Sequence, residues 1–482
     1  MREILSNLMD AASRRADYAD VRHVRSRAER LAVRGGSVEA ADRTDEEGIG
    51  VRVRLGGGWG FAAARGSDRA AAEEALERAL AVADGAPRSA GAGAPLAPER
   101  PASGRFTAGV APGEDPFEVP VSEKLAVLAA AEEAMRGDPR LRVTSAHFLA
   151  FGEEKVFASS EGALFEQSTA ECGGGIVAHA VEGGEAQIRS YPASFRGDVA
   201  QAGYGHFAAL DLETHAPRVA EEALALLSAP VCPAQRTTLI LDGEQLALQL
   251  HESVGHAVEL DRILGSEASY AGTSFLSPGD LGRRGYGSSL MNVTADATTP
   301  GGLGTFGWDD EGVPAQATPI VREGVLTGFL SSRESAAEIG LERSAGCMRA
   351  AGFARQPLVR MTNLHLEPGA AGSLEDLIAD TDRGVLMETN RSWSIDSRRL
   401  HFQFATELAY EIRAGRRGRL LRNPSYSGVT PEFWTGLDAV CSRSDWRLHG
   451  VINCGKGEPG QAMRVSHGTS PARFRNVQVG VA

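Results

Sequence analysis

Histidine and glutamate side chains lie close together in the segment HESVGH, residues 251–256, which has the pattern HExxxH. In the commoner HExxH pattern, two histidines one helical turn apart bind a single zinc ion, and the intervening glutamate activates the water bound to it. The same roles would fall here to His251, His256 and Glu252. These residue types indicate metal-assisted hydrolysis. A buried polar network or a partly exposed helix face would use the same residues without binding a metal.

The two histidines are spaced one residue too far apart for a regular helix. Five residues turn an ideal α-helix by about 500°, which leaves the two side chains roughly 140° apart along about 7.5 Å of axis. Apolar residues around them recur at three- and four-residue intervals, which predicts a helix after the strand 237–242. We therefore predict a π-bulge or an unwound turn at 253–256, which Gly255 tolerates because it has no Cβ.

A third protein ligand would hold zinc and leave a fourth position for water. Cys454 is a candidate, because it lies in VINCGKGEPGQ, where a short strand enters a glycine turn. A thiolate suits the borderline softness of zinc. A lone cysteine is more commonly a small buried apolar side chain. Spacing alone does not choose between Cys454 and the rival ligands His365, His401, His449 and His467.

Two acidic residues, Glu259 and Asp261, follow the second histidine closely. Either could hydrogen-bond a ligand histidine and fix its orientation. Both are also compatible with ordinary charge on a helix surface.

The second half of the chain, residues 231–482, is predicted to be one domain that contains the HExxxH helix. It begins with the strand 237–242 and becomes glycine-rich after the helix, with strand-like segments at 319–330, 357–366 and 400–412. Helices are too sparse to supply the crossovers of a parallel sheet. The predicted fold class is therefore α+β, with a C-terminal domain rich in antiparallel β-structure.

The first half, residues 1–230, is predicted to be an N-terminal α+β domain with an internal repeat. Segments in which apolar and polar residues alternate, interrupted by glycines, recur at an offset of 125 residues. This offset aligns Gly48 with Gly173 and Gly50 with Gly175. Each copy, 1–85 and 122–229, reads as a helix, about four antiparallel strands and a further helix. The intervening stretch 86–121 is rich in proline, alanine and glycine, which predicts a mobile linker or surface loop.

Composition excludes several classes of function. The net charge of −13 argues against nucleic-acid binding, and the arginine-rich run at 413–422 is predicted to be a solvated hairpin with Arg416 and Arg417 at its tip. No apolar stretch is long enough to span a membrane, and the N-terminus reads as an amphipathic helix rather than a signal peptide. Five scattered cysteines give no disulfide framework, so we expect a cytoplasmic protein.

Several long motifs, in order along nearly the whole chain, resemble the TldD/PmbA family of metallopeptidases. They include HESVGHAVELDR, GSEASYAGTSF, the block TNRSWSIDSRRLHFQFATELAYEI, SGVTPEFW, INCGKGEPGQ and SHGTSPARFRNVQVG. The family has zinc-binding TldD-like members and others that lack the metal residues and act as partner subunits. This sequence resembles the zinc-binding kind.

The resemblance implies that His251, His256 and Cys454 bind one zinc ion per chain and that Glu252 is the catalytic base. It further implies a peptidase acting on unfolded polypeptides or short peptides, in a cavity closed by a homodimer or by a heterodimer with a paralogous subunit. Exposed strand edges in the N-terminal half could bind an extended peptide through its backbone. The family has also been labelled as modulators of DNA gyrase, but the acidic charge of this chain gives direct DNA binding no support.

Three alternatives remain open. The first is a non-catalytic peptide-binding partner subunit, although such a scaffold would not need a general base at position 252. The second is a zinc amidohydrolase that acts on small molecules through the same chemistry. The third is a chain in which His251 and His256 are structural and bind no metal.

Overall fold

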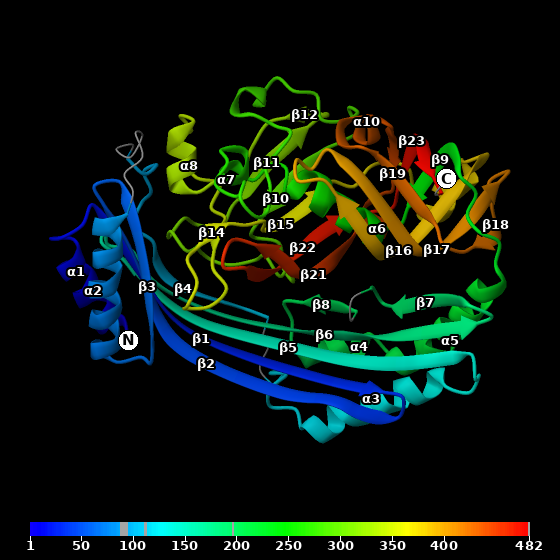
Figure 1. Cartoon of the computed structure of the whole chain (residues 1–482), viewed down its shortest axis with the longest axis horizontal. Coiled ribbons are helices and arrows are strands. Elements are labelled where there is room, and N and C mark those ends of the chain that lie inside the picture. The colour runs from blue at the N-terminus through cyan, green and yellow to red at the C-terminus, as the bar shows by residue number, and fades with distance from the viewer. Residues whose placement is uncertain (87–94, 110–112, 195–196, 481–482) are drawn as a thin grey trace.

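A long curved sheet forms one layer of the molecule, and the C-terminal half lies along its concave side (Figure 1). The structure is a computed structural model that describes residues 1–86, 95–109, 113–194 and 197–480. Helices and mostly antiparallel strands are mixed along the chain, which confirms the predicted α+β class. No helix within these described ranges combines the length and apolarity needed to cross a membrane.

In the N-terminal half, a helix followed by three long strands occurs twice. β1 and β5 pair antiparallel and join the two sets in one sheet. The first set has three strands and the second has four, where the sequence predicted about four in each copy. The first set is α1 (Arg2–Ala12), β1 (Tyr18–Arg34), β2 (Ser37–Leu55), β3 (Gly58–Arg65) and α2 (Arg69–Gly85). The second set is α3 (Val121–Met135), β5 (Leu141–Ser159), β6 (Leu164–Glu182), β7 (Glu185–Tyr191) and α5 (Leu212–Ser228), with β8 (Asp198–Ala200) and α4 (Tyr204–Ala209) before α5.

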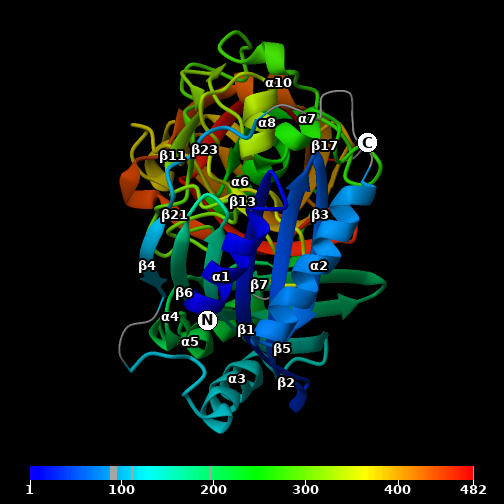
Figure 2. The same cartoon turned by 90° about the vertical axis from the view of Figure 1, so that its left-hand side faces the viewer.

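Gly-Gly pairs form tight turns in both sets, because both residues adopt positive φ angles. Gly56 (φ 56°) and Gly57 (φ 85°) connect β2 to β3, and Gly183 and Gly184 connect β6 to β7. The helices α1 and α2 cover the β1–β3 end of the sheet (Figure 2). We retain the domain division near residue 230 and the duplication as proposals.

The stretch between the two sets is more ordered than its composition indicates. Residues 103–108 form β4 (Ser103–Ala108), which pairs parallel with β6. Ala97 and Ala102 are buried, and the backbone N–H of Ala97 donates to the carbonyl of Arg333. The prediction of a linker or surface loop over 86–121 is therefore wrong for this part. Residues 87–94 and 110–112 lie outside the described ranges.

The C-terminal half combines a closed barrel with a second sheet. The strands β16 (Arg383–Ile395), β9 (Gln235–Leu241), β23 (Ala472–Val479), β19 (Ser425–Val429) and β17 (His401–Arg413) follow one another, and β17 pairs again with β16. The second sheet runs in the order β12 (Val325–Leu326), β11 (Ala317–Arg322), β10 (Val293–Asp296), β15 (Asn363–Leu366), β22 (Gln461–Thr469) and β21 (Arg447–Lys456). Helix α6 (Gly243–Leu250) packs against β16 and β22, between barrel and sheet.

Shorter elements complete this half. They are α7 (Leu260–Ile263), α8 (Arg333–Glu338), α9 (Leu374–Ala379), α10 (Thr430–Thr435), β13 (Met348–Arg349), β14 (Leu358–Val359), β18 (Arg416–Leu421) and β20 (Leu437–Val440). Two 3-10 turns lie at Pro278–Asp280 and Arg443–Asp445. β17 and β18 form the hairpin predicted for the arginine-rich run, but its turn is Ala414–Gly415, because Arg416 and Arg417 already pair with β17.

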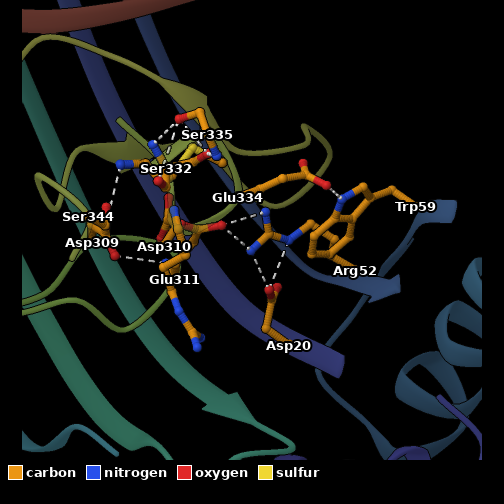
Figure 3. A network of polar contacts seen from close by, with 12 residues as sticks. Asp20, Arg52, Trp59, Asp309, Asp310, Glu311, Ser332, Glu334, Ser335 and Ser344 are labelled. Carbon is orange, nitrogen blue, oxygen red and sulfur yellow. Dashed lines mark hydrogen bonds and ion pairs between the residues drawn. The ribbon is translucent and has the colours of Figure 1, made fainter. Parts of the chain in front are cut away.

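A buried ion network joins the N-terminal sheet to the C-terminal half (Figure 3). Arg52 on β2 donates to Asp20 on β1 at 2.6 Å and to Glu311 of the C-terminal half at 3.3 Å. These three side chains are at most 3% exposed. Nearby, the indole N–H of Trp59 donates to Glu334 at 3.0 Å. Buried charges tolerate little displacement from their partners, so this network fixes where the sheet lies against the C-terminal half.

Candidate metal centre

The helix that carries the histidines widens at the histidines themselves. Asp242 caps the start of α6 by accepting from the backbone N–H of Gln245. After Leu250 the chain makes one π-turn, His251–Gly255, in which the N–H of His256 donates to the carbonyl of His251 at 3.1 Å. The predicted irregularity is thereby confirmed. It brings the two imidazoles to a centroid distance of 4.8 Å.

Cys454 on β21 meets these two imidazoles. Its Sγ lies 3.6 Å from Nε2 of His256, and one donor atom from each of His251, His256 and Cys454 lies within 4.8 Å of the others. All three residues are buried. This is the only such cluster found in the described parts of the chain, and His365, His401 and His449 lie outside it. The third candidate ligand thus comes from a strand 198 residues after His256.

The outward-facing nitrogens of both imidazoles have partners. Nδ1 of His251 lies 2.7 Å from Nε2 of His467, and Nδ1 of His256 lies 3.0 Å from Oε2 of Glu259. With each Nδ1 occupied, each Nε2 is left to face the cluster. His467, a rival ligand from the sequence, therefore contacts a candidate ligand instead of joining the cluster. Asp261 contacts Lys456 at 2.8 Å rather than a histidine.

Burial and neighbouring charges keep these groups in metal-binding forms. Burial lowers the pKa of His251 to about 4, which keeps the ring neutral. Burial would raise the pKa of the Cys454 thiol, but His256 and Arg360 outweigh it and lower that pKa. A neutral imidazole at His251 and a thiol at Cys454 made more acidic by its neighbours suit a borderline ion such as zinc, and the three residues leave coordination positions open.

Glu252 has a partner that the sequence did not reveal. Burial would raise its pKa, but His256, His251 and Arg399 outweigh burial and lower the pKa. Nη1 of Arg399 donates to Oε2 of Glu252. Arg399 lies between β16 and β17 with a left-handed backbone, φ 62°, a conformation that is uncommon outside glycine and often found at functional sites. Its only sequence signal is its place in the block TNRSWSIDSRRL.

A cavity of about 390 Å³ opens beside the cluster. Its floor is the face of α6 and the π-turn that carries Glu244, Leu248 and His251. One wall is the run 449–455 on β21, and the other is the end of β16 with Arg399. β21 pairs with β22 on one side and is the last strand of its sheet, so an edge without a strand partner in that sheet lies beside the candidate ligands.

Three family profiles match the chain in order. The PmbA/TldA metallopeptidase domain 1 matches residues 19–83, the central domain matches 114–227, and the C-terminal domain matches 234–481. The cluster and the cavity floor lie within the region matched by the C-terminal profile.

Similar proteins extend over the same length. A metalloprotease of Methanothermobacter thermautotrophicus is 32% identical over 98% of both chains, and a metalloprotease TldD homolog of Haemophilus influenzae is 26% identical over 99% of this chain and 96% of its own. A zinc metalloprotease TldD homolog of Saccharolobus solfataricus is 26% identical over 50% of this chain and 51% of its own. Among solved structures, TldE from Thermococcus kodakarensis has the same fold, with a TM-score of 0.75 at 17% identity over 99% of this chain and 100% of its own.

Proposed function

Because this chain belongs to the PmbA/TldD metallopeptidase family, we propose that it is a zinc-dependent peptidase with one zinc ion per chain. His251, His256 and Cys454 are the proposed ligands, and Glu252 is the proposed general base. One observation carries the proposal: three buried soft and borderline donors, from segments far apart in sequence, converge beside a cavity with a carboxylate next to them. A zinc metalloprotease among the relatives supports the choice of ion.

The residues around the cavity have separate tasks in this proposal. When bound, zinc would activate a water molecule and polarise the peptide carbonyl. Glu252 accepts the proton of the attacking water and passes it to the leaving amine. Arg399 holds Oε2 of Glu252 and keeps the carboxylate ionised and oriented. His467 and Glu259 keep the rings of His251 and His256 in place.

We propose unfolded polypeptides or short peptides as substrates. An extended peptide would add to the edge of β21 that does not pair with β22, beyond Gly450, whose backbone N–H donates to Asp198 of β8. Its backbone hydrogen bonds are nearly blind to side chains. We place it on β21 rather than on an edge of the N-terminal sheet, because consecutive residues of β21 line the cavity. A small-molecule amidohydrolase would have no use for this strand edge.

We further propose a cytoplasmic protein that forms a homodimer, or a heterodimer with a paralogous subunit. All five cysteines are unpaired and buried, which suits a reducing compartment. Similarity in fold to TldE agrees with a family that has several kinds of subunit. The net charge of −13 supports neither DNA nor RNA as a partner.

Zinc analysis combined with a peptidase assay tests the proposal. Purified protein should contain one zinc per chain and cleave a denatured polypeptide, and a chelator should remove both properties. Glu252→Gln should keep the zinc and lose roughly 10²–10⁴-fold in cleavage rate, because only the base is removed. Cys454→Ser should lose zinc. Full cleavage by Glu252→Gln, or stoichiometric zinc in Cys454→Ser, would contradict the assignment; binding without cleavage by the unmodified protein would favour a non-catalytic partner.

A further inference from the structure

Lys456, two residues after Cys454, is completely buried although it carries a charge. Its side chain is 0% exposed. Nζ lies 2.8 Å from Oδ1 of Asp261, 2.8 Å from the carbonyl oxygen of Val359 and 3.3 Å from Oε2 of Glu259. A buried ammonium is costly unless it is paired and hydrogen-bonded. Lys456 therefore holds one position, set by these three oxygens.

The Lys456 ammonium shares a carboxylate oxygen with His256. Oε2 of Glu259 lies 3.0 Å from Nδ1 of His256 and 3.3 Å from Nζ of Lys456, and Arg262 donates to it at 3.4 Å. A continuous polar path therefore runs from the imidazole of His256, through Glu259, to Lys456. Since Lys456 and Cys454 are on the same strand, this path joins the elements that carry the nitrogen and sulfur donors.

The strand that carries Cys454 needs such an attachment. β21 is the last strand of its sheet, and its register with β22 shifts between Val451 and Cys454. The ladder resumes only at Cys454, so the sulfur lies directly after an irregular stretch. Arg360 also contacts this strand by donating to the carbonyl of Cys454, and it donates as well to the carbonyl of Gln461 on β22.

We infer that Lys456 is a positioning residue that, through Glu259, sets the distance between the Cys454 thiolate and the His256 imidazole and thereby the metal affinity of the site. This inference rests on the proposed function, because it takes the cluster to be a metal site. Removing the ammonium would remove the ion pairs that tie β21 to Glu259 and Asp261 and would leave the buried Glu259 with one cation fewer, so the strand would lose this attachment to the histidine turn.

Lys456→Met tests this inference, with Lys124→Met as a matched control. Lys124 is also 0% exposed and ion-paired, to Glu29, but it lies on α3 in the N-terminal half. Zinc affinity is measured by competition with a chromophoric chelator. The thiolate-to-cobalt charge-transfer band of the Co²⁺-loaded protein reports the sulfur bond. Lys456→Met should weaken zinc binding about 10–100-fold and weaken the cobalt band, while Lys124→Met lowers stability alone.

A second background keeps the test decisive if Lys456→Met folds poorly. In Glu259→Gln, the path from Lys456 to His256 no longer carries the ion pair, and the buried negative charge is reduced. Adding Lys456→Met to Glu259→Gln should then change zinc affinity less than threefold, because the two residues act as one unit. Unchanged affinity and an unchanged cobalt band in a folded Lys456→Met, or additive losses in the double variant, would overturn the inference. If the unmodified protein bound neither metal, the proposed function itself would fail.

Discussion

Nε2 of His467 lies 2.7 Å from Nδ1 of His251, and both rings are buried. In its neutral form His251 can donate from Nδ1 only when Nε2 carries the lone pair. A hydrogen bond donated by His251 to Nε2 of His467 therefore corresponds to the tautomer of His251 whose Nε2 can bind a metal. A residue that the sequence offered as a rival ligand instead prepares one of the proposed ligands.

Replacement of His467 should weaken metal binding without removing a ligand. We expect His467→Leu to lower zinc affinity by about 10–100-fold, because the ring of His251 loses its orienting partner. His467→Gln should lose less, since its side-chain oxygen can accept the same hydrogen bond. Equal zinc affinities in the two variants, measured by chelator competition, would show that the hydrogen bond is unimportant.

Arg399 should determine how far activity extends into acid. It is one of four groups that lower the pKa of Glu252, with His256, His251 and Trp393. Without the guanidinium that pKa rises, so the carboxylate takes up a proton at higher pH and stops acting as a base. The acid limb of kcat/KM for Arg399→Ala should therefore move to higher pH. Arg398→Ala changes the exposed neighbour and should leave the pH profile unchanged. If Arg399→Ala and Arg398→Ala had the same pH profile, this role of Arg399 would be contradicted.

Gly255 should resist any side chain. A Cβ at this position would lie 2.1 Å from Sδ of the buried Met361. We expect Gly255→Ala to lower the free energy of unfolding by about 1–3 kcal/mol, as overpacking does in well-packed cores. Gly85→Ala is the control, because nothing lies within 4 Å of its added Cβ. Urea unfolding measures the stability of both variants. In a Met361→Ala background, Gly255→Ala should lower the free energy of unfolding by less than it does in the unmodified protein.

His365 should make stability depend on pH. Burial lowers its pKa to about 4, and Nδ1 accepts from the N–H of Gly468 at 2.9 Å. In the unfolded chain a histidine has a pKa of about 6.5. Between about pH 6.5 and pH 4 the unfolded chain therefore binds a proton at His365 that the folded protein does not bind. This contribution, up to about 3 kcal/mol, is present above pH 6.5 and is lost as pH falls to 4.

His365→Asn keeps an acceptor near Gly468 and cannot be protonated. The variant should therefore lose less stability than the unmodified protein when urea unfolding is compared at pH 7.5 and pH 5. The effect is a difference in slope, since other buried histidines also contribute. Identical slopes in the two proteins would show that His365 is not responsible.

The residue spacing predicted the irregular turn, because the two histidines of HExxxH would lie on different faces of a regular α-helix. The same reasoning did not select Cys454 from the rival ligands, and only the resemblance to a family did so. The strand that carries Cys454 comes next to the histidine turn only when the C-terminal half folds. Arg399 and Lys456 gave no usable signal for the same reason. Their roles depend on contacts made 147 residues away, to Glu252, and 195 residues away, to Asp261.

The main error in the fold has a similar origin. The stretch 86–121 has a composition typical of linkers, yet β4 within it pairs with Leu164–Thr169 of β6. Backbone hydrogen bonds supply that pairing, and they place little demand on side-chain type. Hairpins such as β2–β3 and β17–β18 were predictable because their turns are short and glycine-rich. The closure of β16 on β17 into a barrel had no local signature.

The π-turn at His251–Gly255 places this site one residue from another common architecture. Deleting a single codon from 253–255 would let the turn close with an α-helical hydrogen bond and would leave the spacing HExxH. Helices of the two spacings are thus separated by one small genetic step. Because a π-turn of five residues and an α-turn of four each complete about one full turn, that step would leave both imidazoles on the same face of the helix, and Cys454 could serve as the third donor for either spacing.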